Sequence, residues 1–184
     1  MHRSRFAFLA RASEVLASSL QSAELPKKLA SLAVPDLADL CVVRLLAGNT
    51  IADLVTLASV DPLTAAAVEA CQSIRPGCAP DGHPVILAAQ RAAVLIPEVT
   101  DASLAELAGD DQQLAALRDL GLRSVIVVPL VAGKSMLGAM HLAIVKSRRR
   151  FSAEDFELSS QLARLAALAF DRARTHEQLR RLRL

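Results

Sequence analysis

The last third of the chain carries the pattern that most restricts its fold. An apolar run, Ser124 to Leu130, is followed by the turn-forming Ala132-Gly133-Lys134-Ser135 and by a second apolar run, Leu137 to Val145. Branched apolar residues favour β-strands, and a short turn with glycine between two such runs favours a hairpin. The pattern therefore predicts two adjacent antiparallel strands.

A long helix is predicted after this hairpin, and the segment from Phe151 to Phe156 carries the capping signals that predict where it begins. Ser152 can accept a hydrogen bond from the backbone N–H of Asp155, and the Asp155 carboxylate can accept one from the N–H of Ser152. Phe151 and Phe156 can pack together as a hydrophobic staple. These features predict a capped helix that begins directly after Ser152.

Helical and strand-like patterns also mark the earlier part of the chain. Apolar residues at helical spacing predict helices, and runs of branched apolar residues bounded by Gly or Pro predict strands. The predicted helices are about Ser4 to Gln21, Pro26 to Ala33, Asp61 to Ile74, Asp101 to Leu107 and Asp111 to Leu120; the predicted strands are Leu40 to Leu46, Ile51 to Ser59 and Val94 to Ile96, with a loop from Arg75 to Pro84. The middle third is thus a helical excursion between two hairpins.

Composition excludes several classes of protein. The 184 residues suit one domain, and the apolar runs are interrupted before the roughly 18 residues that a membrane span requires. A net charge of +2 gives no strong attraction to nucleic acid or anionic lipid, and 3% aromatic residues leave few surfaces for base stacking. Three cysteines without CxxC spacing argue against a disulfide framework and a zinc site. We expect a soluble, cytoplasmic protein that binds neither nucleic acid nor membrane.

Six segments of the chain carry a recognisable pattern: Val34 to Asp39, Leu95 to Asp101, Leu122 to Leu130, Leu137 to Met140, Phe151 to Asp155 and Leu162 to Ala169. In this order they resemble the corresponding segments of bacterial GAF domains, which are small-molecule sensor modules. The resemblance implies an α+β fold of the profilin/PAS type. In this fold a central antiparallel sheet has the N- and C-terminal helices on one face and a lid over a ligand pocket on the other. It implies one domain over 1–184, divided into N-terminal helices (1–34), sheet and lid (35–150) and a C-terminal signalling helix (151–184).

The resemblance also limits the choice of ligand. The Asn-Lys-Phe-Asp-Glu motif of GAF domains that bind cyclic nucleotides is missing, and no cysteine aligns clearly with the one that carries a bilin pigment. Leu40 stands where similar domains often have an aromatic residue, and Arg44 where an acidic one is common. Cyclic nucleotides and bilins are therefore disfavoured, and the identity of any cofactor stays open.

Strand alternation predicts which side chains face the pocket. In the last strand, one face carries Leu137, Ala139, His141 and Ala143. The other face carries Gly138, Met140, Leu142 and Ile144, which as a set are more hydrophobic and are expected to face the helices. By the same alternation Arg44 shares a face with Leu40 and Val42. Arg44 and His141 in one apolar cavity would favour an anionic or carbonyl-bearing ligand. The alternative is a core histidine and an arginine that extends to a sheet edge. The predicted ligand site consists of Leu40, Val42, Arg44, Glu98, Ser124, Ala139 and His141.

Catalytic alternatives are few. Gly133-Lys134-Ser135 resembles the end of a phosphate-binding loop, but Val128 stands where that motif needs its first glycine, so a hairpin turn is the preferred interpretation. Cys71 and Cys78 would suit a GAF-fold thiol enzyme that reduces free methionine sulfoxide, or they are ordinary buried thiols. The histidines show no spacing tied to a nucleophile, and metal-ligand spacing is missing. We expect no enzymatic activity and no metal site.

The C-terminal helix keeps an apolar stripe beyond the length needed to cover a sheet, which implies a partner helix. The resemblance implies a homodimer through the terminal helices that regulates an output kinase or phosphatase. A ligand-free structural dimer is the other alternative. The predicted dimer residues are Leu9, Leu16, Leu162, Leu165, Ala169, Ala173 and Leu179.

Overall fold

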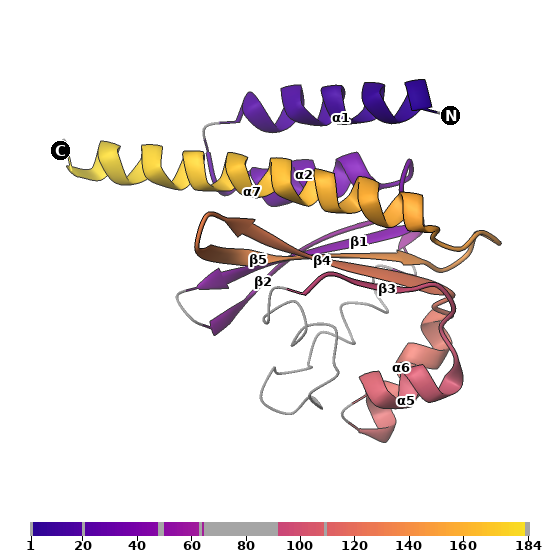
Figure 1. The fold of residues 1–184 in the computed structure, drawn as a ribbon. Coiled ribbons are helices and arrows are strands. Elements are labelled where there is room, and N and C mark those ends of the chain that lie inside the picture. The colour runs from indigo at the N-terminus through magenta and orange to yellow at the C-terminus, as the bar shows by residue number, and fades with distance from the viewer. Residues whose placement is uncertain are drawn as a thin grey trace.

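A computed structural model describes residues 2–19, 21–47, 50–62, 64, 92–108 and 110–182 of the chain. These residues contain a five-stranded sheet in the order β2-β1-β5-β4-β3, in which every neighbouring pair is antiparallel. Because β1 pairs with β5, the first strand lies beside the last (Figure 1). The predicted α+β fold with an antiparallel sheet is confirmed. The strands are β1 (Leu40–Ala47), β2 (Thr50–Ser59), β3 (Val94–Ile96), β4 (Ser124–Ala132) and β5 (Ser135–Ile144).

Three helices lie on one side of the sheet: α1 (His2–Ala17), α2 (Leu25–Ala33) and α7 (Ala153–Leu182). α2 packs against β1 and β2, and α7 packs against β4 and β5. α1 lies on the outer surface of α2 and α7, so the helices form two layers (Figure 1). The prediction that the terminal helices lie on one side of the sheet is confirmed. The position of α1 in an outer layer was not predicted. None of the described helices is both long and apolar enough to span a bilayer.

Two short helices lie on the other side of the sheet: α5 (Asp101–Leu107) and α6 (Asp111–Leu120) (Figure 1). Thr100 caps α5 by accepting a hydrogen bond from the Ser103 N–H at 3.2 Å, and Gly121, with φ of +67°, follows α6. Both helices have the predicted bounds. Residues 65–91 lie outside the described part of the chain. Most of the predicted helix from Asp61 to Ile74 and all of the predicted loop from Arg75 to Pro84 fall within them.

The two connections that frame β5 follow their sequence signals. Ala132 pairs with Ser135 across a two-residue turn in which Gly133 has φ of +57°. The Gly-Lys-Ser segment is therefore a hairpin turn, as predicted. At the start of α7, Ser152 Oγ accepts from the Asp155 N–H at 3.2 Å, and Asp155 Oδ2 accepts from the Ser152 N–H at 2.8 Å, which confirms the capping box.

The sheet separates two apolar clusters. On the helix side, β5 contributes large side chains that pack with α2 and α7, whereas on the other face it contributes alanines. Leu137 is the exception, because it was predicted on the face of Ala139 and instead packs with the helix-side cluster. The register of β4 and β5 shifts between Leu130 and Val131, and such a bulge reverses the face of the residues beyond it. On the Ile144 side of the bulge the predicted alternation holds, and Met140, Leu142 and Ile144 face the helices.

Asp39, just before β1, closes the opposite end of β5. One of its carboxylate oxygens accepts hydrogen bonds from the backbone N–H groups of Val145, Lys146 and Ser147 at 3.0, 3.1 and 2.9 Å. Burial raises the pKa of Asp39, but these hydrogen bonds outweigh burial and hold the pKa below its usual value. The ionised carboxylate therefore fixes the chain where it leaves the sheet.

Replacing Gly138 by alanine should destabilise the fold, because a Cβ atom there would lie 2.1 Å from the carbonyl oxygen of Arg44. We expect Gly138→Ala to lower the free energy of unfolding by about 3 kcal/mol, as overpacked cores do. Gly133→Ala, where a Cβ atom meets nothing within 4 Å, should cost about 1 kcal/mol through its positive φ alone. Urea denaturation measures both, and equal losses would contradict the close approach of β1 and β5.

The Asp39 interaction should give stability that depends on pH. Since the pKa is lower in the folded state, its contribution is complete above the unfolded value of about 3.9 and is lost as pH falls through the folded value. We expect Asp39→Asn to cost about 3 kcal/mol at pH 7 and clearly less at pH 3. Asp36→Asn, which removes an exposed ion pair with Arg11, should cost under about 1 kcal/mol. Urea unfolding measures the difference in the free energy of unfolding between the wild type and Asp39→Asn. The same difference at pH 7 and at pH 3 would refute this assignment.

Candidate functional site

The sheet face opposite the long helices brings together five of the predicted ligand residues. Across the strands, Val42 of β1 pairs with His141 of β5, which pairs with Val127 of β4. Two residues further along β1, Arg44 pairs with Ala139, so Arg44 and His141 are diagonal neighbours on the same face of the sheet. Leu40, Val42 and Ala139 are buried in the apolar cluster of this face. The lid-side site is our name for this group: Leu40, Val42, Arg44, Ala139 and His141.

Side-chain size distinguishes the lid-side site from the rest of the sheet. Around His141, β5 presents Ala139 and Ala143 on this face, and both are buried although their side chains are single methyl groups. The same strand fills the helix side with larger residues. Small apolar side chains thus lie beside a half-buried histidine and a half-buried arginine, and apolar surroundings with a few polar groups are typical of small-molecule sites.

The other two predicted ligand residues lie elsewhere. Ser124 pairs with Ile144 and so faces the helices; its hydroxyl donates to the carbonyl oxygen of Ile96 at 3.0 Å and accepts from the Phe151 N–H at 3.1 Å. Glu98 forms an ion pair with Arg150 at 2.8 Å, and both side chains are more than half exposed. The structure therefore gives Ser124 a bridging role between β3, β4 and the start of α7, and it places Glu98 at a charged surface.

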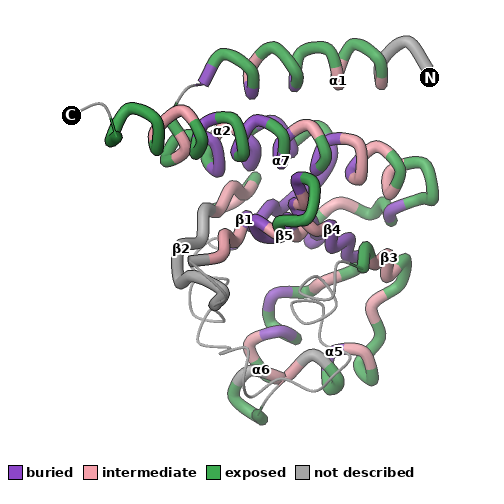
Figure 2. The backbone as a smooth tube through the Cα atoms, turned by 60° about the vertical axis from the view of Figure 1, so that its left-hand side comes forward, coloured by how far each residue is buried: buried purple, intermediate pink, exposed green. Residues whose placement is uncertain are grey.

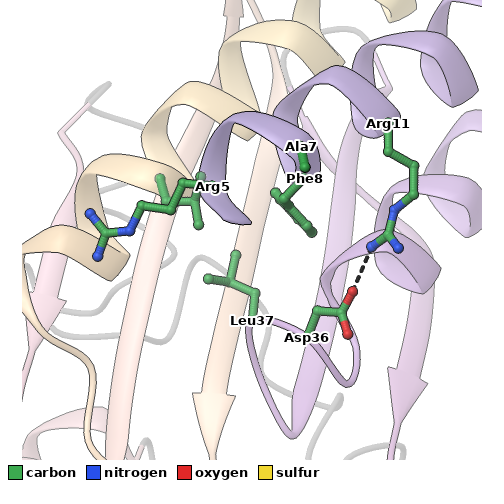
Figure 3. A pocket seen from close by; sticks show the side chains of 7 residues that line it. Arg5, Ala7, Phe8, Arg11, Asp36 and Leu37 are labelled. Atoms are coloured by element: carbon green, nitrogen blue, oxygen red, sulfur yellow. Dashed lines mark hydrogen bonds and ion pairs between the residues drawn. The ribbon is translucent and has the colours of Figure 1, made fainter. Parts of the chain in front are cut away.

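A cavity of about 360 Å³ lies beneath α1, apart from the lid-side site. Figure 3 shows Phe8 of α1 and Leu37 of the α2–β1 connection facing each other across it, with Arg5 and Arg11 on α1 to either side. Arg11 pairs with Asp36 at 2.5 Å, and Arg5 pairs with Glu154 in the first turn of α7. These ion pairs, which the sequence analysis missed, help to hold α1 over the other helices.

Comparison with known proteins decides the family. The family model described as the GAF domain matches residues 23–171, which is most of the chain. The chain belongs to the GAF family. A search of curated proteins finds no match.

Solved GAF structures resemble the whole fold at low sequence identity. The GAF domain of a phosphoenolpyruvate-protein phosphotransferase from Coxiella burnetii superposes with a TM-score of 0.67 at 12% identity, covering 93% of this chain and 95% of that one. The GAF-B domain of DevS from Mycobacterium smegmatis gives 0.58 at 18% identity, covering 86% and 99%. Free methionine-R-sulfoxide reductase from Neisseria meningitidis, in complex with its substrate, gives 0.61 at 16% identity, covering 93% and 90%. At these identities the similarity establishes the fold.

The described part of this GAF chain contains one cysteine, Cys41, and it is buried on the helix side. Burial raises the pKa of its thiol far above the usual range, so it stays protonated and unreactive. Cys71 and Cys78, the predicted candidates for thiol chemistry, lie outside the described residues. Among those residues, no three side chains of the His, Cys, Asp and Glu types come together to hold a metal ion.

The predicted dimer residues are mostly used within the GAF chain itself. Four of them pack into its helix-side core, namely Leu16, Leu162, Ala169 and Ala173, and Leu165 packs against that core. Leu9 is half-buried in α1, and Leu179 is 51% exposed. The surplus stripe of α7 therefore covers α1 as well as the sheet. Large apolar side chains that α7 leaves exposed are Leu168, Leu179 and Leu182. Figure 2 shows that α7 is mostly exposed toward its C-terminal end.

The bridging role of Ser124 can be measured. Ser124→Ala leaves the Phe151 N–H without its acceptor in a buried place, and we expect it to lower the free energy of unfolding by about 2 kcal/mol. Ser160→Ala, which removes a hydroxyl that donates to a carbonyl of its own helix, should change it by under about 0.5 kcal/mol. If urea unfolding finds Ser124→Ala as stable as Ser160→Ala, the hydroxyl is not a structural bridge.

Proposed function

We propose that the chain is a sensory and regulatory GAF module that binds a small anionic or carbonyl-bearing molecule at the lid-side site. The observation that carries this proposal is the placement of Arg44 and His141 as diagonal neighbours beside Ala139. A guanidinium and an imidazole can both donate hydrogen bonds to a carboxylate or carbonyl oxygen. The apolar residues around them would cover the rest of the molecule and exclude water.

We also propose that the module acts as a cytoplasmic homodimer and regulates an output partner such as a kinase or phosphatase. Support comes from the outer face of α7, where Leu168, Leu179 and Leu182 recur at spacings of eleven and three residues and so share one side of the helix. Exposed large apolar residues in such a row favour contact with a second helix. The residues proposed for this contact thus replace the predicted ones that the chain buries in its own core.

The signalling step would be a population shift. A molecule bound beside Ala139 and His141 contacts one face of β5, while the other face of β5 packs against α7. A ligand shifts an equilibrium between two arrangements only by its difference in affinity for them. The two arrangements would differ in how the helices lie on the sheet, because α7 is both the cover of β5 and the carrier of the exposed apolar row.

Native mass spectrometry of freshly purified protein tests ligand binding and assembly together. We expect the wild type to appear as a dimer that retains a small molecule. In Ala139→Trp the indole would fill the site and the molecule should be lost. Arg44→Gln should bind about tenfold more weakly, the effect of losing a hydrogen bond to a charged group. Arg164→Gln, a change on the exposed face of α7, serves as the matched control for ligand binding and should retain the molecule as the wild type does.

Thermal unfolding with a panel of anionic metabolites gives the second readout. Stabilisation of the wild type by a panel member, reduced in Arg44→Gln but not in Arg164→Gln, is expected. A wild type that neither retains a molecule nor is stabilised by any panel member would overturn the sensor proposal, and a monomer would overturn the dimer. Consumption of free methionine sulfoxide with a dithiol, lost in Cys71→Ser or Cys78→Ser, would instead establish a thiol enzyme.

A further inference from the structure

An open groove of about 450 Å³ lies between the distal half of α7 and the ends of β1 and β5. Its floor is apolar: Leu45 and Leu46 from β1, Leu137 from β5 and Phe170 from α7. Leu45, Leu137 and Phe170 belong to the helix-side cluster, so the groove and the lid-side site are on opposite faces of the sheet. The groove therefore plays no part in the ligand binding proposed above.

The rim of the groove carries positive charge. Arg174 and Arg181 are seven residues apart on α7 and so share one face of the helix, with Gln178 between them. The side chain of Arg174 forms no hydrogen bond or ion pair with another residue in the described part of the chain. A cation without a counter-ion beside an apolar floor favours a ligand that supplies the missing charge.

Among the described residues of the rim, the one acidic side chain is already engaged. Glu177 accepts hydrogen bonds from the N–H of Ser22 at 2.8 Å and from its hydroxyl at 2.9 Å, one on each carboxylate oxygen. These two hydrogen bonds, the largest causes, lower the pKa of Glu177, and the neighbouring Arg181 acts in the same direction. With two arginines and one carboxylate that is held by Ser22, the rim keeps a net positive charge.

We propose that this groove binds a small anionic amphiphile of the fatty-acid type. Its carboxylate would pair with Arg174, since a guanidinium presents two parallel N–H donors to a carboxylate, with Arg181 adding a second positive charge. Its aliphatic chain would cover the floor formed by Leu45, Leu46, Leu137 and Phe170. The groove has the volume of a small-molecule site. Arg174, Glu177 and Arg181 all follow residue 171, where the GAF family match ends.

Isothermal titration with sodium decanoate, below the concentration at which it forms micelles, tests the proposal. Saturable binding is expected, and octanoate should bind about tenfold more weakly because two fewer methylene groups are buried. Decyltrimethylammonium has the same chain with a positive head group and should not bind. These comparisons separate the contribution of the chain from that of the charge.

Variants on the rim and outside it locate the site. Arg174→Gln should weaken decanoate binding about tenfold, and Gln178→Glu, which adds a negative charge at the rim, should also weaken it. Arg164→Gln, on an exposed part of the same helix, and Ala139→Trp, in the lid-side site, should bind decanoate as the wild type does. All rim positions changed are surface side chains of one helix, and far-UV circular dichroism checks that the variants fold.

Three results would overturn the proposal: no saturable binding of decanoate, equal affinity in Arg174→Gln and Arg164→Gln, or equal binding of decyltrimethylammonium. Loss of decanoate binding in Ala139→Trp with wild-type binding in Arg174→Gln would also overturn it and would move the amphiphile to the lid-side site. Failure of the sensor proposal leaves the expected results for the groove unchanged, because the two sites share no residue.

Discussion

The pairing of β1 with β5 is the constraint on which the rest of the structure depends. It joins Val42 to His141, two residues far apart in sequence, at the centre of the sheet. Gly138 lets the backbone of β1 approach at one end, and at the other end the carboxylate of Asp39 binds the chain as it leaves β5. A slip of one residue would move every β5 side chain to the wrong face. These two contacts therefore decide which side chains meet the helices and which lie in the lid-side site.

The division of β5 into a face of large side chains and a face of small ones explains how one sheet could serve both stability and the ligand binding proposed above. Burial of the large side chains against α2 and α7 supplies the hydrophobic stabilisation, which grows with the apolar area removed from water. Alanines on the other face bury less apolar area and so contribute less of that stabilisation, and they lie beside Arg44 and His141. A guanidinium and an imidazole on this face are also the groups that could donate hydrogen bonds to the carboxylate or carbonyl group of the ligand proposed above.

Local signals in the sequence predicted most of the fold, because each depends on neighbouring residues. The capping box at Ser152, the glycine turn at Gly133 and the alternation along β5 required no knowledge of distant contacts. The failures involve contacts between distant segments. The bulge that turns Leu137 toward the helices depends on the register with β4, and both faces of β4 are apolar, so polarity gave no sign that Ser124 faces α7. The apolar stripe of α7 predicted a partner helix in a dimer, whereas the structure shows that α1 of the same chain packs against α7.

The links among the helices indicate which motion a ligand at the lid-side site can drive. Arg172 of α7 donates a hydrogen bond to the carbonyl oxygen of Ala17 at the end of α1, and Glu177 holds Ser22 in the connection to α2. Near the other end of α1, Arg5 pairs with Glu154. A shift of α7 alone would break these contacts, whereas a shift of all three helices over the sheet would keep them. Because apolar packing between helices and sheet has no fixed direction, sliding of the helical layer costs less than its separation. We therefore expect binding at β5 to be transmitted as a movement of the helical layer as a unit, which carries the exposed row of α7 with it.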